Sequence, residues 1–306
     1  MDDTKKFFPE FTSTGEIDGD DIFLVHDGNG IKKITLSNLE KSFFKNFSTE
    51  AGLHNSLYRG KKLGTSLTAD QQAAIAAGTF DDMYIGDYWE INGYKWRIAA
   101  FDYWLHMGDT ECTTHHVVIV PDENLLVADG STTHYMNTSN ITTGAYVGSG
   151  FYSGTNADSS SNTAKATCQT KAKSAFGASH ILTHREYLKN ATTDGYESAG
   201  AWYDSDVELM TEEMVYGGKE LKNIIAGTHV PANYTIDQSQ LPLFALDHSK
   251  ICNRANWWLR DVVSSTNFAN VNNNGNCNNN NASNANIGVR PDFVTAPHVV
   301  AYMQKE

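Results

Sequence analysis

The chain has 306 residues, of which 40% are apolar and 11% aromatic, so it can bury the core of one large domain or of two smaller ones. Only 19% of the residues are charged and the net charge is −13, which disfavours nucleic acid and anionic membranes as partners because both are negatively charged. No apolar run reaches the roughly 20 residues that a membrane-spanning helix requires. We therefore expect neither nucleic-acid binding nor membrane insertion, although such acidity is also typical of a protein that only has to stay soluble.

The amino terminus, MDDTKKFFPEF, has no apolar segment followed by a small-residue cleavage site, so the sequence predicts synthesis in the cytoplasm without a signal peptide. The four cysteines are widely spaced and form no Cys-x-x-Cys pair: Cys112, Cys168, Cys252 and Cys277. We expect them to be reduced structural thiols rather than ligands of a zinc ion.

Residues 1–45 are predicted to form a small N-terminal module. An apolar strand over 22–25 and a returning strand over 31–36 flank a turn, which predicts a β-hairpin. Ser37 and Glu40 have the spacing of a capping box and predict a short helix after this hairpin. A hairpin with one helix is too small to be stable alone, so we expect the module to pack against something larger.

Residues 46–80 are expected to form a connector followed by a short helix. The first part contains three glycines, which is typical of a linking segment. Thr68 and Gln71 repeat the capping-box pattern and predict a helix over 69–77, which ends at Gly78.

Residues 81–306 are predicted to form the main domain, and its first part is rich in strands. Two aromatic segments, 89–91 and 94–98, flank Asn92-Gly93, which predicts a β-hairpin with a type I′ turn. Residues 117–120 form a continuous apolar run and predict a further strand.

The middle of this domain is predicted to contain a loop and two helices. Residues 129–163 are rich in Ser, Thr, Gly and Asn, which indicates a long loop of the kind that carries function or disorder. Helices are predicted over 164–176 and, from the capping-box pair Thr183 and Glu186, over 184–190. Strands return toward the C-terminus, so the fold class is α+β, with irregular antiparallel sheets and flanking helices.

The C-terminal run NWWLRDVVSSTNFANVNNNGNCNNNNASNANIGVRPDF resembles the C-type-lectin-like domains of phage virion proteins and of the variable proteins of diversity-generating retroelements. The matching segments are Trp257-Trp258-Leu259-Arg260, the strand over 268–271, and Gly288-Val289-Arg290-Pro291. With the upstream stretch GDYWEINGYKWRIAAFDYW, the resemblance spans roughly residues 80–295 and implies a C-type-lectin-like domain. The segment GDDIFLVHDGNGIKKITLSNLEKSF resembles N-terminal segments of phage tail fibre and baseplate proteins.

Four residues of the C-terminal run are expected to be structural anchors: Trp257, Trp258, Arg260 and Arg290. The apolar residues around them can supply buried strand faces. Each arginine lies inside an apolar segment, so we expect it to find a carboxylate or carbonyl partner there.

Between these anchors the sequence changes character, because twelve of the twenty residues from Asn267 to Asn286 are asparagine. Asn is a poor strand former that tolerates turns, so the run is predicted to lie outside the core, as an exposed loop and edge or as a disordered segment. Composition alone favours a low-complexity solvated loop. Because two rigid anchors flank the run, the alternative is a display surface whose backbone is held in place.

The resemblance gives this alternative a specific form. In retroelement systems the mutated positions are template adenines, and an Asn codon there can change to most residue types but never to a stop codon. The Asn-rich run is therefore similar to a variable region that has not been diversified. The predicted ligand-binding residues are Asn267, Asn270, Asn272, Asn273, Asn274, Asn276, Asn278, Asn279, Asn280, Asn281, Asn284 and Asn286.

No convincing set of catalytic residues is found, so we expect no enzyme activity, no cofactor and no metal ion. The sequence contains no Gly-x-Ser-x-Gly and no His-Glu-x-x-His motif. His115 and His116 are adjacent, and neighbouring strand residues point to opposite faces, so the two cannot chelate one ion together. The calcium motifs of sugar-binding C-type lectins are absent. Cys252 and Cys277 do not lie in the motif of the formylglycine-generating oxidase that shares the fold.

The sequence thus predicts a phage or prophage virion protein of the tail fibre or baseplate. Its N-terminal module would dock onto other virion proteins, and its C-type-lectin-like domain would bind a bacterial cell-surface receptor, either a protein or a glycan. Because phage tail-tip proteins are commonly trimeric, we expect a homotrimer, made in the bacterial cytoplasm and located in the virion tail. The alternatives are a purely structural capsid-fibre or decoration protein without its own receptor, and an enzyme that uses the same scaffold.

Overall fold

The computed structural model describes residues 20–26, 28–36, 38–39, 50–127, 134–142, 163–190, 198–218 and 239–297. The chain forms two compact units, residues 1–49 and residues 50–306. Small helices and several antiparallel sheets give the mixed α and β structure that the sequence predicts. Within the described ranges, no helix is both long and apolar enough to cross a membrane.

The described part of the first unit is mainly a β-hairpin, as predicted. Strands β1 (Ile22–His26) and β2 (Ile31–Thr35) pair antiparallel along their full length. Ser37 and Glu40, the pair of the predicted capping box, lie outside the described residues. Three large apolar side chains of the hairpin are exposed: Ile22, Leu24 and Ile31.

The second unit is built around a six-stranded sheet with the strand order β3-β4-β5-β6-β13-β9. Its strands are β3 (Lys62–Gly64), β4 (Tyr88–Ile91), β5 (Tyr94–Phe101), β6 (Val117–Pro121), β13 (Pro291–Thr295) and β9 (Val207–Leu209). All neighbours pair antiparallel except β3 and β4, which are parallel. Because β13 lies between β6 and β9, the C-terminal part of the unit is joined to its N-terminal part in one sheet.

The hairpin of β4 and β5 confirms the predicted turn and carries part of the core. Asn92 and Gly93 both have positive φ, 53° and 81°, as a type I′ turn requires. Trp89 and Trp96 are fully buried, and their rings meet Phe176 edge-to-face at centroid distances of 5.6 and 5.9 Å. These aromatic contacts join the sheet to the end of a helix and stabilise both.

The helices of the second unit's described part are α2 (Ala51–His54), α3 (Ala69–Ala77), α4 (Ala164–Phe176), α5 (Glu212–Tyr216), α6 (Pro242–Leu246) and the 3₁₀ helices η2 (Ala178–His180) and η4 (His248–Lys250). Helix α3 confirms its prediction, because Thr68 and Gln71 form the capping box and Gly78 ends the helix in the left-handed conformation. Helix α4 occupies the predicted residues and buries every fourth one: Ala164, Cys168, Ala172 and Phe176.

Residues 184–190 form a strand, so the helix predicted there is wrong. Strand β7 (His184–Asn190) pairs antiparallel with β8 (Ser198–Ser205). The capping-box spacing of Thr183 and Glu186 is a local signal, but the Glu186 side chain is buried and accepts a hydrogen bond from Arg260 Nη1 at 2.7 Å. A contact with a residue far along the chain therefore overrides the local helix signal.

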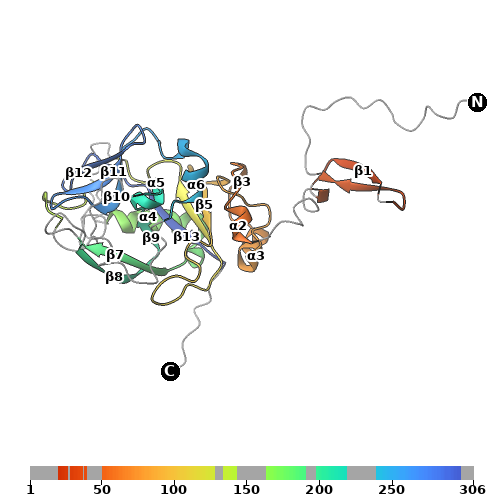
Figure 1. The fold of residues 1–306 in the computed structure, drawn as a ribbon, viewed down its shortest axis with the longest axis horizontal. Helices are drawn as coiled ribbons and strands as arrows, with labels where there is room; N and C mark the ends of the chain where they lie inside the picture. Colours follow the sequence, from red (N-terminus) through yellow and green to blue (C-terminus); the bar gives the residue numbers. More distant parts are fainter. Residues whose placement is uncertain are drawn as a thin grey trace, which may run out of the picture. The chain divides into compact units, whose positions relative to one another are not determined.

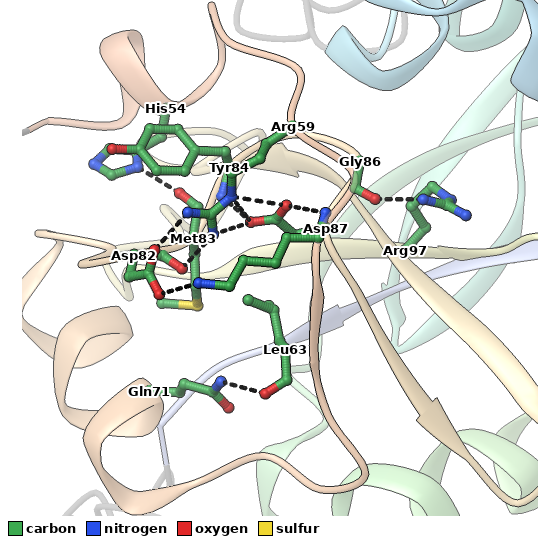
Figure 2. Close-up of polar contacts among 11 residues, drawn as sticks. His54, Arg59, Leu63, Gln71, Asp82, Met83, Tyr84, Gly86, Asp87 and Arg97 are labelled. Atoms are coloured by element: carbon green, nitrogen blue, oxygen red, sulfur yellow. Dashed lines mark hydrogen bonds and ion pairs between the residues drawn. The ribbon is translucent and has the colours of Figure 1, made fainter. Parts of the chain in front are cut away.

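The predicted connector folds as part of the second unit, where an arginine clamp attaches it to the sheet (Figure 2). Arg59 donates from Nη2 to Asp87 Oδ2 at 2.6 Å and from Nη1 to Asp82 Oδ1 at 2.5 Å. Lys61 Nζ donates to Asp82 Oδ2 at 3.0 Å, and Tyr84 N donates to the buried Asp87 at 2.9 Å. Since two cations face two carboxylates, the cluster is electrically balanced, and we interpret it as structural.

A second sheet carries the Asn-rich run. Strands β10 (Trp257–Val262), β11 (Asn267–Val271) and β12 (Cys277–Asn281) pair antiparallel in that order, so the predicted strand over 268–271 is confirmed. In Figure 1 these blue strands lie at one end of the second unit, whereas α2 and β3 lie at the other end. The Asn-rich segment is therefore remote from the point where the chain enters this unit.

Candidate functional site

Residues 267–286, which we call the Asn-rich hairpin, form an ordered structure rather than a long loop. β11 and β12 pair in register over their full length. The backbone N–H of Asn272 donates to the carbonyl of Asn276 at 2.9 Å and closes the turn between the strands. Gly275 in this turn has a φ of 85°, a conformation that favours glycine. The expectation of an exposed loop and edge thus holds for the turn and for β12 but not for β11.

Asn270 in β11 is fully buried, so its predicted exposure is wrong. Its partner across the ladder is Trp258 of β10, and because paired residues share a face of the sheet, Asn270 is drawn into the core beside Trp258. Asn280 Nδ2 donates to Asn270 Oδ1 at 2.9 Å, and Asn284 Nδ2 donates to Asn280 Oδ1 at 2.9 Å. A chain of three amides therefore leads from the surface into the core.

Three further asparagines also bind other parts of the hairpin. Asn267 Nδ2 donates to Asn279 Oδ1 at 2.7 Å, which links the two strands. Asn272 Oδ1 accepts hydrogen bonds from the backbone N–H groups of Asn274 and Asn276, at 2.9 and 3.0 Å. These side chains hold the strands and the turn together, so they are less available to a ligand than the sequence predicts.

The remaining asparagines point to solvent, as predicted. Their side chains are exposed in the turn, along β12 and just before the following anchor: Asn273, Asn274, Asn276, Asn278, Asn281 and Asn286. Amide side chains at such positions offer two N–H donors and one carbonyl acceptor each. The structure therefore divides the twelve predicted ligand residues into an exposed set and a set bound within the protein.

Residues outside the hairpin brace the backbone of its turn. Asn256 Oδ1 accepts a hydrogen bond from Asn273 N at 2.9 Å, and Tyr216 Oη donates to Gly275 O at 3.1 Å. Cys252 packs so closely under the turn that a Cβ on Gly275 would lie 2.9 Å from the Cβ of Cys252. No local sequence pattern predicts these bracing residues, because the turn that they contact lies far along the chain from them.

Part of the predicted loop over 129–163 also contacts the hairpin, in its described residues 134–142. Asn140 Oδ1 accepts hydrogen bonds from Ser283 N at 3.2 Å and from Ser283 Oγ at 2.5 Å. The carbonyl of His134 accepts a hydrogen bond from Trp258 Nε1 at 2.8 Å. This segment thus supports both the end of the hairpin and the strand behind it.

The predicted anchors in β10 form a rigid platform behind the hairpin. Trp257 and Trp258 are buried, and the partner of Arg260 is a carboxylate, as predicted. Burial raises the pKa of Glu186, but the positive charge of Arg260 and a hydrogen bond from His184 outweigh it and hold that pKa at about 2. Glu186 is therefore ionised at neutral pH and neutralises the buried Arg260.

Asp292 in β13 has the opposite electrostatic environment. Its carboxyl is buried, and burial together with the negative charges of Glu186 and Glu208 raises its pKa well above the usual value. Asp292 and Glu208 are register partners on neighbouring strands. Burial and these two neighbouring carboxylates therefore disfavour the charged form of Asp292.

Arg290 confirms the prediction of carbonyl partners. Its Nε donates to Pro121 O at 2.7 Å, and its Nη1 donates to Lys250 O at 2.8 Å. The guanidinium also lies over the ring of Trp257, 5.2 Å from the centroid. Burial lowers the pKa of Arg290 to about 10, so the side chain stays charged at neutral pH.

The histidine and cysteine side chains of the second unit's described part do not gather into a metal site. His116 is buried, which lowers its pKa to about 4, whereas His115 is partly exposed and donates from Nδ1 to Asp102 Oδ2 at 2.7 Å. Cys252 and Cys277 are both free thiols. Over the described ranges, no three His, Cys, Asp or Glu side chains are grouped so that they could hold a metal ion.

Residues 145–296 match a family model described as a domain of unknown function, DUF6273. The matched segment contains the platform strand β10 and the whole Asn-rich hairpin, and it ends just after β13. It leaves out β3 to β6, which complete the six-stranded sheet. Neither the curated proteins nor the solved structures give a match to the chain.

Proposed function

We propose that this chain is a virion protein of a phage or prophage tail fibre or baseplate. Its second unit would have a C-type-lectin-like fold and bind a receptor on the bacterial surface through the exposed side chains of the Asn-rich hairpin. The first unit would dock the chain, as a homotrimer, onto other virion proteins. Two features support this proposal: the resemblance of the C-terminal run to phage virion proteins, and the geometry of the Asn-rich hairpin.

The burial of the anchor residues and their hydrogen-bond partners support this proposal. Trp258 and Val289, which flank the run, are 1% and 2% exposed. Arg260 and Arg290 both have the kind of partner that the pattern requires. A buried frame on each side of a sequence-tolerant segment is what a protein needs if its binding residues are to vary while its fold stays constant.

One observation carries the proposal: the turn of the hairpin is braced through its backbone while its side chains stay exposed. The bonds from Asn256 and Tyr216 go to main-chain atoms of Asn273 and Gly275, so they do not depend on the side chains of the turn. A surface of this kind is pre-organised, and little conformational entropy is lost when a ligand binds it. The six exposed asparagines are also the positions where retroelement diversification would alter binding without unfolding the domain.

The experiment is to measure binding of the full chain to a panel of bacterial cells. The test variant replaces Asn273, Asn274 and Asn276 with Tyr, and the control replaces the exposed Thr65 and Ser66 with Tyr at the other end of the unit. We expect both variants to keep the melting temperature of the parent, because exposed substitutions usually change stability by less than about 0.5 kcal/mol. Only the hairpin variant should change which cells are bound or how tightly.

The result can also contradict the proposal. If the hairpin variant folds and its binding profile equals that of the parent and of the control, the Asn-rich hairpin is not the receptor-binding surface. If the parent binds no cells but is still required for particle assembly, the chain is a structural virion protein without its own receptor.

A further inference from the structure

The surface of the Asn-rich hairpin carries no charge. From Val262 to Val289 the sequence contains no Asp, Glu, Lys, Arg or His, in a chain whose net charge is −13. From Ala269 to Ile287 it contains no aromatic residue either. The hairpin itself therefore offers no counter-charge for an ionic ligand and, from Ala269 to Ile287, no aromatic ring on which a flat ligand could stack; the half-buried Tyr216 contacts its turn from outside. The groups that remain for recognition are amides.

The edge of β12 is also poorly suited to pairing with an added peptide strand. The turn hydrogen bond from Asn272 to Asn276 sets the ladder so that the backbone of Asn279 and Asn281 points away from β11. The Asn279 N–H already donates to Asn278 Oδ1 at 2.8 Å, and the Asn281 carbonyl accepts from Asn284 N at 2.8 Å. A peptide that added itself as a further strand would have to break both bonds.

Beyond Asn281, the described loop residues cover the chain. Asn137 N donates to the carbonyl of Ala282 at 2.9 Å, and His134 forms an isolated bridge with Asn286. The edge is therefore occupied both by its own side chains and by a neighbouring segment. Side-chain amides, rather than backbone groups, are therefore what the hairpin edge presents to a partner.

We propose that the turn residues Asn273, Asn274 and Asn276, with Asn278, bind an uncharged, hydroxyl-rich polysaccharide of the bacterial surface. This inference rests on the proposed receptor-binding function and specifies its ligand. A hydroxyl is both donor and acceptor, and an amide presents both kinds of group side by side, so neighbouring hydroxyls match neighbouring amides. Binding needs no metal ion in this arrangement, because the amides contact the hydroxyls directly.

The chemistry also predicts how the binding behaves. Without charge pairs, the affinity should change little with salt, since screening acts only on charges. Because the turn itself contributes amides and no aromatic ring, each site should bind weakly, and a multivalent assembly is needed for firm attachment to cells. An anionic polysaccharide should be repelled by the strongly acidic chain.

The test uses a bacterial strain that the full chain binds. Cells are treated with periodate, which cleaves the vicinal diols of sugars, or with proteinase K, and binding is then measured from about 0.05 to about 0.5 M NaCl. The variant changes Asn273, Asn274 and Asn276 to Ala, and the control changes Thr65 and Ser66 to Ala. Melting temperatures of both variants establish that they are folded.

We expect periodate to abolish binding, proteinase K and salt to leave it unchanged, and the hairpin variant to bind about tenfold or more weakly than the control. Loss of binding after proteinase K but not after periodate would overturn the inference in favour of a protein receptor, while the proposed receptor-binding function would stand. Binding that falls steeply with salt would overturn it in favour of a charged ligand. If the chain binds no cells at all, the proposed function itself fails.

Discussion

Strands β10 and β12 are the two outer strands of one three-stranded sheet, yet every residue of β10 is buried and none of β12 is. The outer edge of β10 is covered by other segments, since Trp258 N donates to Gly288 O at 3.0 Å and Arg260 N donates to Met210 O at 3.0 Å. The edge of β12 is closed by its own short amides. The two strands therefore occupy equivalent edge positions in the sheet but have different surroundings.

The difference shows how one sheet can combine a fixed part with a variable part. In β10, large rings and a buried ion pair need particular neighbours, so few substitutions are tolerated there. In the turn before β12, Asn256 and Tyr216 brace the backbone, and the exposed side chains of Asn273, Asn274 and Asn276 are free to change. The boundary between the two regimes lies at the end of β11, where Phe268 to Val271 are buried, Asn270 included, and the exposed turn begins.

The largest effect should come from truncating the platform. Trp258→Ala is expected to destabilise the second unit by about 3–5 kcal/mol, because it opens a cavity and leaves the His134 carbonyl without its donor. Urea unfolding of the full chain measures the change. A loss of less than about 1 kcal/mol in the free energy of unfolding would mean that β10 is not the rigid strand of the three-stranded sheet.

Breaking the buried ion pair should have the next largest effect. Glu186→Gln keeps the size of the side chain but leaves Arg260 as a buried charge without its carboxylate, which should cost about 3 kcal/mol. The adjacent Arg185 is a matched control, because its partners Asp109 and Asp204 are on the surface, and Arg185→Gln should cost less than about 1 kcal/mol. Equal losses in the two variants would show that the pair at Arg260 is no more important than a surface contact.

Two asparagines of the same hairpin should differ in effect. Asn270→Ala removes the buried acceptor of Asn280 Nδ2 and should cost about 1–3 kcal/mol, whereas the exposed Asn276→Ala should cost less than about 0.5 kcal/mol. Thermal unfolding of both variants, measured side by side, tests this. Similar values would place the boundary between fixed and variable residues somewhere other than β11.

The last expected effect is a dependence on pH. The pKa of His116 is about 4 in the folded chain and 6.5 in its ordinary state, so between these values the unfolded chain takes up a proton that the folded chain excludes. This contribution to stability is present above about pH 6.5 and is lost as the pH falls toward 4, with about 2 kcal/mol lost at pH 5. Stability of His116→Gln, whatever its value at pH 7, should decline less than that of the parent between pH 7 and pH 5. Parallel curves would contradict the prediction.

Elements whose signals are local could be predicted from the sequence. The capping box and terminal glycine of α3, the Asn-Gly turn between β4 and β5, and the extent of α4 all depend on residues a few positions apart. The anchors could also be predicted, since an arginine inside an apolar run needs a buried partner wherever that partner lies, and the large apolar ring of a tryptophan there favours burial. Composition alone established that the Asn-rich run differs from its flanks.

Tertiary structure decided what no short window contains. It made a strand of residues 184–190, because Glu186 meets Arg260 across the core. It buried Asn270 beside Trp258, and it braced the turn with Tyr216 and Asn256 from other parts of the chain. The physical reason is the same in each case: an amide or a carboxylate is polar in any sequence, but whether it is buried depends on which distant group supplies its hydrogen bond.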